Sequence, residues 1–349
     1  MNNKISKKHA IIGCGRIAPN HIFGCQSNGI EVAKCYDLKK EKAEKFAEKY
    51  SVNKVAESFE EVLEDPEITS VSICTDHGSH ARLTIQALNA GKNVVVEKPM
   101  ALSVTDAQEM IDTAKRNNRT LCVISQHRYN DMIRYIRSLI KNGELGDITV
   151  VNATLNSSKK VEYYTESGWR GTLEKEGGST LINQGIHTLD LVVWFLGAPT
   201  ELLSYKTNLK FKGIIETEDT LASIMKFENG GLGVFSSTNT SVDEWDSKIE
   251  FIGMKGSITF STGFPARILS LEHENEEIKA RIRAELDKYL ENDMSADNLP
   301  PTMNYYGTTH REQMADFFKV SNGEKEKLDI DPAEGMKTLD VVLRMYNSN

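Results

Sequence analysis

The sequence IIGCGRIA, at residues 11–18, follows a short apolar run and opens a helical pattern. It has the form G-x-G-x-x-G/A, in which the first glycine permits a tight turn and the second lets a pyrophosphate approach the backbone. Ala18, at the last position, allows close packing of the helix on the strand. Because the helix N-terminus would face the phosphates, we expect a dinucleotide to be bound by Gly13, Gly15, Arg16 and Ile17.

The first 126 residues alternate between β-rich runs and amphipathic helical segments. The predicted strands are 9–14, 31–37, 70–75, 93–97 and 120–126. Helices are predicted at 39–50, 79–89 and 103–117, the last opened by a capping box of Ser103 and Asp106. This alternation predicts a parallel, doubly wound sheet, and therefore an α/β Rossmann domain over residues 1–126.

The second predicted strand ends in an acid, Asp37, which lies 24 positions after Gly13. A carboxylate near this spacing accepts hydrogen bonds from the ribose 2′-OH and repels a 2′-phosphate. No arginine immediately follows it, so the sequence favours NAD over NADP as cofactor. The alternative is a tight turn without a ligand, in which Asp37 only caps the next helix.

A charge pair and a proline end the strand at 93–97. Lys98 therefore lies at the carboxyl edge of the sheet, where ligands bind, and its ammonium group can hydrogen-bond a hydroxyl that is becoming a carbonyl. The alternative is a solvated lysine paired with Glu97. Along the same edge, we expect contacts with the cofactor from Thr75, His80, Glu97 and Lys98.

The pattern changes after residue 126. Long β-rich runs are predicted at 147–157, 201–209, 220–227, 232–240 and 248–260, with turns at 228–231 and 255–256. Helices are predicted at 132–141, 179–196, 310–320 and 332–346, and a highly charged, solvated helix at 272–293. Residues 127–349 are therefore expected to form an α+β domain with an open, mostly antiparallel sheet.

The helix predicted at 179–196 carries two stripes. One is apolar, with Ile182, Ile186, Leu189 and Val193 at helical spacing. The other is polar and contains Asn183, His187 and Asp190. A buried helix has little reason to carry three polar groups in register unless they meet a ligand or each other. The alternative is a histidine whose hydrogen bonds are satisfied inside the protein.

Composition excludes several classes of function. The chain has 349 residues, a net charge of −8 and no basic block, which argues against nucleic-acid binding. No apolar run approaches the length of a membrane span, and the polar, basic start does not fit a signal peptide. The five cysteines are odd in number and match no metal motif, so we expect buried reduced thiols, no metal site and a cytoplasmic location.

Three motifs together resemble the Gfo/Idh/MocA oxidoreductase family. They are Gly13-x-Gly15 with Asp37, Glu97-Lys98-Pro99, and the segment from Gly177-Gly178 through Asn183, His187 and Asp190. The resemblance spans both predicted domains. It implies NAD-dependent oxidation of a secondary alcohol on a sugar or cyclitol, or the reverse reaction. It also implies a second domain whose open sheet places its helix against the nicotinamide and often mediates oligomerisation, so a homo-oligomer, dimer or tetramer, is expected.

One feature suggests a branch of the family. Many members have aspartate where this chain has Asn183. With this asparagine, and with Gly168-Trp169-Arg170-Gly171 upstream, the chain resembles the branch of the family that oxidises UDP-N-acetylglucosaminuronic acid at C3. Trp169 suits a sugar face, or alternatively domain packing, and Arg170 suits an anionic group. We expect substrate contacts from Lys98, Trp169, Arg170, Asn183 and His187.

The resemblance implies catalytic roles for Lys98, His187 and Asn183. His187 would accept the hydroxyl proton, Lys98 would stabilise the developing oxyanion, and Asn183 would orient the substrate or the imidazole. The alternatives are an inositol dehydrogenase, another hexose or cyclitol dehydrogenase, or a non-catalytic NAD-binding regulator. Intact Lys98 and His187 argue against the regulator.

Overall fold

The computed structural model describes residues 8–263, 266–294 and 309–348. Its contacts divide the chain into two units, Met1–Gln126 with Thr308–Met336, and His127–Gly307 with Lys337–Asn349. Each unit is described by itself. Among the described residues, none of the helices is long and apolar enough to cross a membrane.

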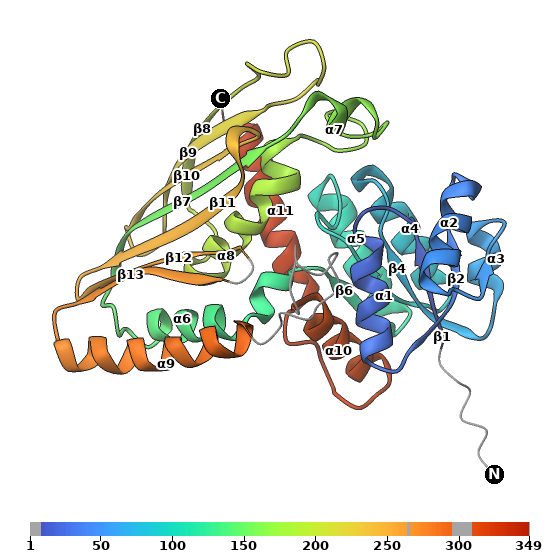
Figure 1. Cartoon of the computed structure of the whole chain (residues 1–349), viewed down its shortest axis with the longest axis horizontal. Helices are drawn as coiled ribbons and strands as arrows, with labels where there is room; N and C mark the ends of the chain where they lie inside the picture. Colours follow the sequence, from blue (N-terminus) through green and yellow to red (C-terminus); the bar gives the residue numbers. More distant parts are fainter. Residues whose placement is uncertain (1–7, 264–265, 295–308, 349) are drawn as a thin grey trace. The chain divides into compact units, whose positions relative to one another are not determined.

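The first unit is built on a six-stranded sheet, ordered β3-β2-β1-β4-β5-β6, in which all neighbouring strands run parallel (Figure 1). This order is that of the Rossmann fold and confirms the predicted doubly wound sheet. The strands are β1 (Lys8–Ile12), β2 (Glu31–Tyr36), β3 (Lys54–Val55), β4 (Ile68–Ile73), β5 (Asn93–Val96) and β6 (Leu121–Val123). The helices that connect them are α1 (Ala18–Ser27), α2 (Lys40–Tyr50), α3 (Phe59–Glu64), α4 (His77–Asn89) and α5 (Val104–Arg116).

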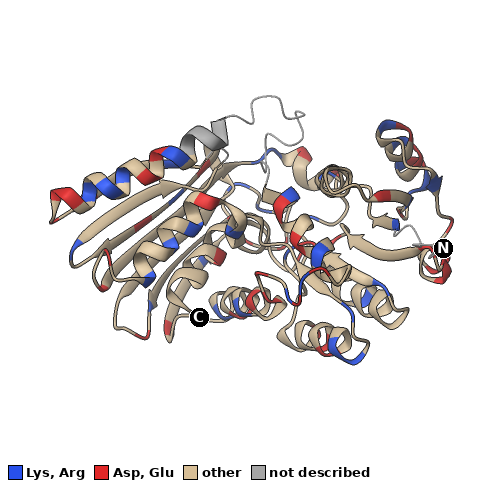
Figure 2. Ribbon diagram, turned by 90° about the horizontal axis from the view of Figure 1, so that it is seen from below, with Lys and Arg blue, Asp and Glu red and all other residues tan. Residues whose placement is uncertain are grey.

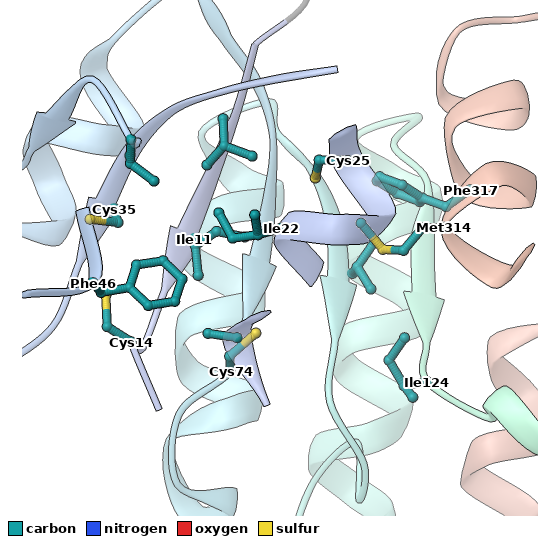
Figure 3. Packing of buried hydrophobic residues seen from close by; sticks show 14 of the residues in the cluster. Ile11, Cys14, Ile22, Cys25, Cys35, Phe46, Cys74, Ile124, Met314 and Phe317 are labelled. Carbon is teal, nitrogen blue, oxygen red and sulfur yellow. The ribbon is translucent and has the colours of Figure 1, made fainter. Parts of the chain in front are cut away.

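Helix α10 (Thr309–Ser321) belongs to the first unit, although it lies near the end of the chain. Met314 and Phe317 are buried in one cluster with Ile22 of α1 (Figure 3). The Gln313 side chain accepts a hydrogen bond from the Ser125 N–H (2.9 Å) and donates one to the Val123 carbonyl (2.8 Å). The prediction that everything after residue 126 forms the second domain is therefore wrong for Thr308–Met336, because α10 completes the first core.

The five cysteines are all free and buried, as predicted. They share the hydrophobic cluster of the first unit with Ile11 and Phe46, and Figure 3 shows four of them, Cys14, Cys25, Cys35 and Cys74. Burial raises the pKa of Cys122 to about 12, so this thiol stays protonated and packs as a small apolar side chain.

The second unit is built on a seven-stranded sheet, ordered β13-β12-β11-β7-β10-β9-β8 (Figure 1). Among the described strands of this sheet, only β10 and β7 pair in parallel, so the predicted mostly antiparallel sheet is confirmed. The strands are β7 (Ile148–Ser158), β8 (Glu201–Thr207), β9 (Thr220–Lys226), β10 (Leu232–Thr238), β11 (Thr240–Gly253), β12 (Gly256–Ser261) and β13 (Arg267–His273). The run predicted at 248–260 is two strands, joined at the predicted turn.

Helices cover one face of this sheet and leave the other open (Figure 1). Along β9 and β10, buried and exposed side chains alternate; η2 contacts both of these strands, and α8 contacts β7 and β11. The helices of the unit are α6 (Asp131–Lys141), α7 (Val161–Thr165), η2 (Thr180–Gly185), α8 (Ile186–Leu196), α9 (Glu276–Met294) and the part of α11 (Pro332–Tyr346) that follows Met336. Figure 2 shows charges of both signs along α9, the helix predicted to be solvated.

Candidate active site

The turn between β1 and α1 has the backbone shape that its glycines predict. Gly13 has φ +91°, and a Cβ there would lie 2.6 Å from the Cys74 carbonyl oxygen, so only glycine fits. At Gly15 the nearest atom to such a Cβ is 3.9 Å away, which leaves room for a ligand against the backbone. No side chain caps α1 at Ile17, and Arg16 is exposed beside it. The turn therefore fits a pyrophosphate bound at the helix N-terminus.

Asp37 lies just after β2 and beside this turn. Its Oδ2 accepts a hydrogen bond from the Cys14 N–H and its Oδ1 accepts one from the Lys39 N–H, both at 2.9 Å. The carboxylate is fixed in place by these two bonds, yet two oxygens offer about four acceptor sites, so capacity remains for a ribose hydroxyl. The next residue, Leu38, is 88 % exposed, and the Lys42 ammonium group lies 3.8 Å from Asp37 Oδ2.

Thr75 and His80 follow β4 at the same edge of the sheet. The Thr75 hydroxyl contacts the Ser79 hydroxyl at 2.6 Å. His80 is fully buried, and its ring nitrogens contact the Pro99 carbonyl (2.8 Å) and the Thr75 carbonyl (3.3 Å). Since both nitrogens face the protein backbone, His80 is better suited to holding Pro99 against β4 than to contacting a cofactor.

Glu97 is buried at the end of β5 and holds the segment that carries Lys98. Its Oε1 contacts His21 Nε2 (3.0 Å) and His310 Nε2 (3.3 Å), and its Oε2 accepts a hydrogen bond from the Lys98 N–H (3.2 Å). Burial alone would raise the pKa of Glu97, but the two histidines outweigh it and hold that pKa well below its usual range. Glu97 is thus an anion whose bonds position Lys98, which is half-buried at the predicted edge.

Two further features of this edge escaped the sequence analysis. His21 and His310 come from α1 and α10, and nothing in their spacing links them to Glu97. Gln126, after β6, is buried, and neither atom of its side-chain amide has a hydrogen-bond partner among the described residues. A buried amide in this state, at the carboxyl end of a Rossmann strand, fits a polar group of a bound dinucleotide.

In the second unit, the helix predicted at 179–196 has two parts, the π-helix η2 and the α-helix α8. Glu218 Oε1 accepts hydrogen bonds from the N–H groups of Ser179 (3.2 Å) and Leu181 (3.0 Å) and from the Tyr346 hydroxyl (2.8 Å). The wider π-helical turns immediately precede His187, and such turns are frequent at functional sites.

The polar stripe on this helix divides into two. Asp190 forms a buried, two-pronged ion pair with Arg128, at 2.7 and 2.8 Å, and accepts a hydrogen bond from the Thr338 hydroxyl at 2.7 Å. Removing one partner of such a pair leaves a buried charge and costs about 3–5 kcal/mol, so Asp190 stabilises the unit. Asn183 and His187 remain as candidates for chemistry.

Asn183 and His187 are only 8 % and 7 % exposed. The Asn183 side-chain amide donates to the Glu176 carboxylate and, at 3.4 Å, to the Tyr163 hydroxyl. The His187 ring lies edge-on to the His127 ring, with centroids 5.4 Å apart. Both candidates are therefore held among polar neighbours in a region that excludes most water.

Trp169 and Arg170 are half-buried beside these groups. The Arg170 guanidinium lies over the Tyr163 ring (4.3 Å) and the Trp169 ring (4.8 Å). Its Nε is buried and has no hydrogen-bond partner among the described residues. A stacked guanidinium with a donor still to satisfy is well suited to bind an anionic group.

Glu176 is a functional candidate that the sequence analysis missed. It is fully buried, and its two oxygens accept hydrogen bonds from the Gly171 N–H and the Asn183 amide, so it joins the Arg170 segment to η2. Burial raises its pKa to about 7, although the hydrogen bonds and the nearby Arg170 charge oppose the rise. In sequence it ends a charged run, Glu174-Lys175-Glu176, which is typical of a solvated surface.

Comparison with known families agrees with these observations. Residues 7–125 match the N-terminal domain of the Gfo/Idh/MocA family, which is described as "Oxidoreductase family, NAD-binding Rossmann fold". Residues 133–259 match the C-terminal domain of the same family. Together these matches cover well over half of the chain.

Two of the relatives are named as dehydrogenases of sugars. D-glucoside 3-dehydrogenase of Escherichia coli is 29 % identical, over 74 % of this chain and 77 % of its own. Glucose-6-phosphate 3-dehydrogenase of Bacillus subtilis is 30 % identical, over 74 % of this chain and 75 % of its own. The crystal structure of the WlbA dehydrogenase from Chromobacterium violaceum, in complex with NADH and UDP-GlcNAcA, has a TM-score of 0.84 and 26 % identity, and covers 99 % of this chain and 94 % of its own. The chain belongs to the Gfo/Idh/MocA oxidoreductase family, and its first unit is the NAD-binding Rossmann domain of that family.

Proposed function

We propose that this protein is an NAD(H)-dependent dehydrogenase that oxidises the C3 alcohol of a nucleotide sugar, UDP-N-acetylglucosaminuronic acid. The observation that carries the choice of substrate is the stacked Arg170, whose buried Nε has no partner among the described residues. The uronate carboxylate supplies the anion that this donor requires. Similarity to two 3-dehydrogenases and to an enzyme crystallised with UDP-GlcNAcA supports the same choice.

In the proposed reaction, His187 accepts the proton of the C3 hydroxyl, and Lys98 donates a hydrogen bond to the oxygen as it gains negative charge. Asn183 orients the substrate or the imidazole. NAD, when bound, supplies a nicotinamide that accepts the hydride from C3. Gly13, Gly15, Arg16 and Ile17 would hold the pyrophosphate, Asp37 the ribose, and Thr75 and Gln126 further polar groups. His80 and Glu97 would act on the cofactor site through the Pro99 and Lys98 backbone.

We also propose a homo-oligomer, formed through the open face of the sheet. Ile224, 60 % exposed in β9, lies opposite Leu203 in β8 and Val234 in β10, and both neighbours are exposed as well. A row of exposed aliphatic side chains across three strands is typical of a protein interface. The five free thiols support a cytoplasmic location, since reducing compartments keep cysteines in this state.

Replacing either Lys98 or His187 should abolish most of the turnover while cofactor binding is retained. Because proton transfer and oxyanion stabilisation would be lost, Lys98→Ala and His187→Ala should each lower kcat with NAD and UDP-N-acetylglucosaminuronic acid by roughly 10²–10⁴-fold. Formation of NADH measures kcat, and a fluorescence titration checks that NADH still binds. Lys115→Ala, at an exposed lysine of α5, is the control. Full turnover by both variants would contradict the mechanism, and NAD binding without turnover on any UDP-sugar, hexose or inositol would favour the regulator.

The proposed role of Arg170 predicts a change in selectivity. Arg170→Met should lower kcat/KM for the uronate roughly tenfold to a hundredfold, because a charged hydrogen bond contributes about 1.5–3 kcal/mol. It should affect UDP-N-acetylglucosamine, which has a neutral alcohol in place of the carboxylate, much less. The ratio of the two kcat/KM values is the measurement, and Lys175→Met, at an exposed lysine, is the control. An equal loss on both substrates would argue that Arg170 is structural.

Cofactor preference should depend on Asp37. The double variant Asp37→Ser, Leu38→Arg should lose roughly tenfold in affinity for NAD(H) and gain affinity for NADP(H). The carboxylate that repels a 2′-phosphate is then removed, and a cation is added at an exposed position. Fluorescence titrations with both reduced cofactors give the two Kd values. Leu38→Arg alone is the matched control, and unchanged preference in the double variant would rule out Asp37 as the ribose ligand.

The proposed interface can be tested by placing a charge on it. Ile224→Lys should shift the assembly toward the monomer, because an ammonium group at the centre of an apolar interface is costly to bury. Sedimentation velocity over a range of protein concentrations measures the change. Met254→Lys, at an exposed turn away from this row, should leave the mass unchanged. A wild-type protein that sediments as a monomer would refute the oligomer.

A further inference from the structure

Glu176 occupies a central place in the second unit, because it contacts both the predicted substrate segment and the predicted catalytic helix. Its Oε2 accepts a hydrogen bond from the Gly171 N–H, next to Arg170, and its Oε1 accepts one from the Asn183 amide. A carboxyl group therefore lies one hydrogen bond behind Asn183.

Gly171 and Asn183 constrain Glu176 differently. The Gly171 N–H can only donate a hydrogen bond. The Asn183 side chain has a donor end, Nδ2, and an acceptor end, Oδ1, and can turn either toward Glu176. An ionised carboxylate only accepts, so it requires the donor end of Asn183. A protonated carboxyl has a hydroxyl to donate, and the acceptor end of Asn183 then satisfies it.

We propose that Glu176 is a positioning residue whose ionisation sets the direction of the Asn183 amide, and so decides which end of that amide faces the reacting groups. With Glu176 ionised, Asn183 presents Oδ1 to the substrate hydroxyl or to His187. With Glu176 protonated, Asn183 presents Nδ2. The catalytic consequence rests on the proposed function, whereas the coupling between Glu176 and Asn183 does not.

The surroundings of Glu176 allow both states near neutral pH. Burial raises its pKa to about 7 and Glu218 adds to the rise, while Gly171, Asn183 and Arg170 oppose it. Tyr164 and Tyr346 also act with Glu176 electrostatically, and both stay neutral because burial raises their pKa values. The Arg170 cation favours the ionised form of Glu176.

Glu218 shows what a purely structural carboxyl does in the same region. It is also buried with a raised pKa, but its Oε1 accepts from two backbone N–H groups and the Tyr346 hydroxyl. The backbone N–H groups cannot turn to offer an acceptor. Glu176, in contrast, bonds the side-chain amide of Asn183, which can reverse.

The coupling is tested by NMR on the whole protein labelled with ¹⁵N-asparagine, without substrate. The Asn183 side-chain signal is identified by its loss in Asn183→Asp. In the wild type, the chemical shift of this signal should change with pH, with a midpoint near pH 7. In Glu176→Gln it should not change with pH, because glutamine does not ionise. Glu174→Gln, at an exposed carboxyl of the same run, should match the wild type.

Several outcomes would overturn the inference. The coupling is overturned if the Asn183 signal of the wild type does not change with pH. It is also overturned if Glu176→Gln shows the same titration as the wild type. Should Glu176→Gln not fold, Glu176→Asp serves as the second variant, because its shorter side chain keeps a carboxyl but cannot reach both partners equally. In Glu176→Asp, the Asn183 signal should titrate with a midpoint that differs from that of the wild type. An identical midpoint counts against the coupling.

Kinetics then tests the catalytic consequence. The pH profile of kcat/KM for the wild type should contain an inflection at the midpoint of the Asn183 titration, and Glu176→Gln should lose it with at least a fivefold change in kcat. A merely structural role would change the melting temperature and leave the inflection. The two hypotheses fail separately. An Asn183 titration in a protein that oxidises no sugar overturns the proposed function alone, and active enzyme with a flat Asn183 signal overturns this inference alone.

Discussion

The segment from Glu176 to Leu196 is almost entirely buried in the second unit, and that burial constrains much of the candidate site. A buried helix must have its free N–H groups and polar side chains satisfied by neighbours, because an unmade hydrogen bond in the interior is costly. Glu218 and Tyr346 satisfy the N–H groups at its start, and Arg128 and Thr338 satisfy Asp190. What remains for chemistry is the short stretch between these two anchors, where Asn183 and His187 lie.

Four buried carboxyl groups show how differently the fold treats the same functional group. Asp190 is paired with an arginine, and Glu97 is held between two histidines with its pKa well below the usual range. For Glu176 and Glu218, burial is the largest influence and raises the pKa of both. Asp190 and Glu97 therefore fix helices and backbone, and Glu97 does so as an anion, whereas Glu176 can change charge near neutral pH.

The Rossmann unit was largely predictable from the sequence because its signals are local. Gly13, Gly15 and Asp37 act within one βα turn and the next strand, and strand–helix alternation is visible along the chain. Lys98 was placed correctly at a strand end for the same reason. His21 and His310 were not found, since their bond to Glu97 joins residues from α1, β5 and α10, which no spacing rule connects.

Helix α10 illustrates the limit most clearly. Its length and amphipathic pattern were evident, but its apolar face could have packed on either unit, and only the folded chain shows Met314 and Phe317 beside α1. Likewise, the charged run Glu174-Lys175-Glu176 predicts a solvated surface, yet Glu176 is buried. Sequence alone determined the nucleotide-binding turn, the acid that follows it and the polar residues on the long helix, because these depend on neighbours in the chain. The tertiary structure decided which carboxyl groups are clamped and which can titrate, because that depends on burial and on partners brought from far along the sequence.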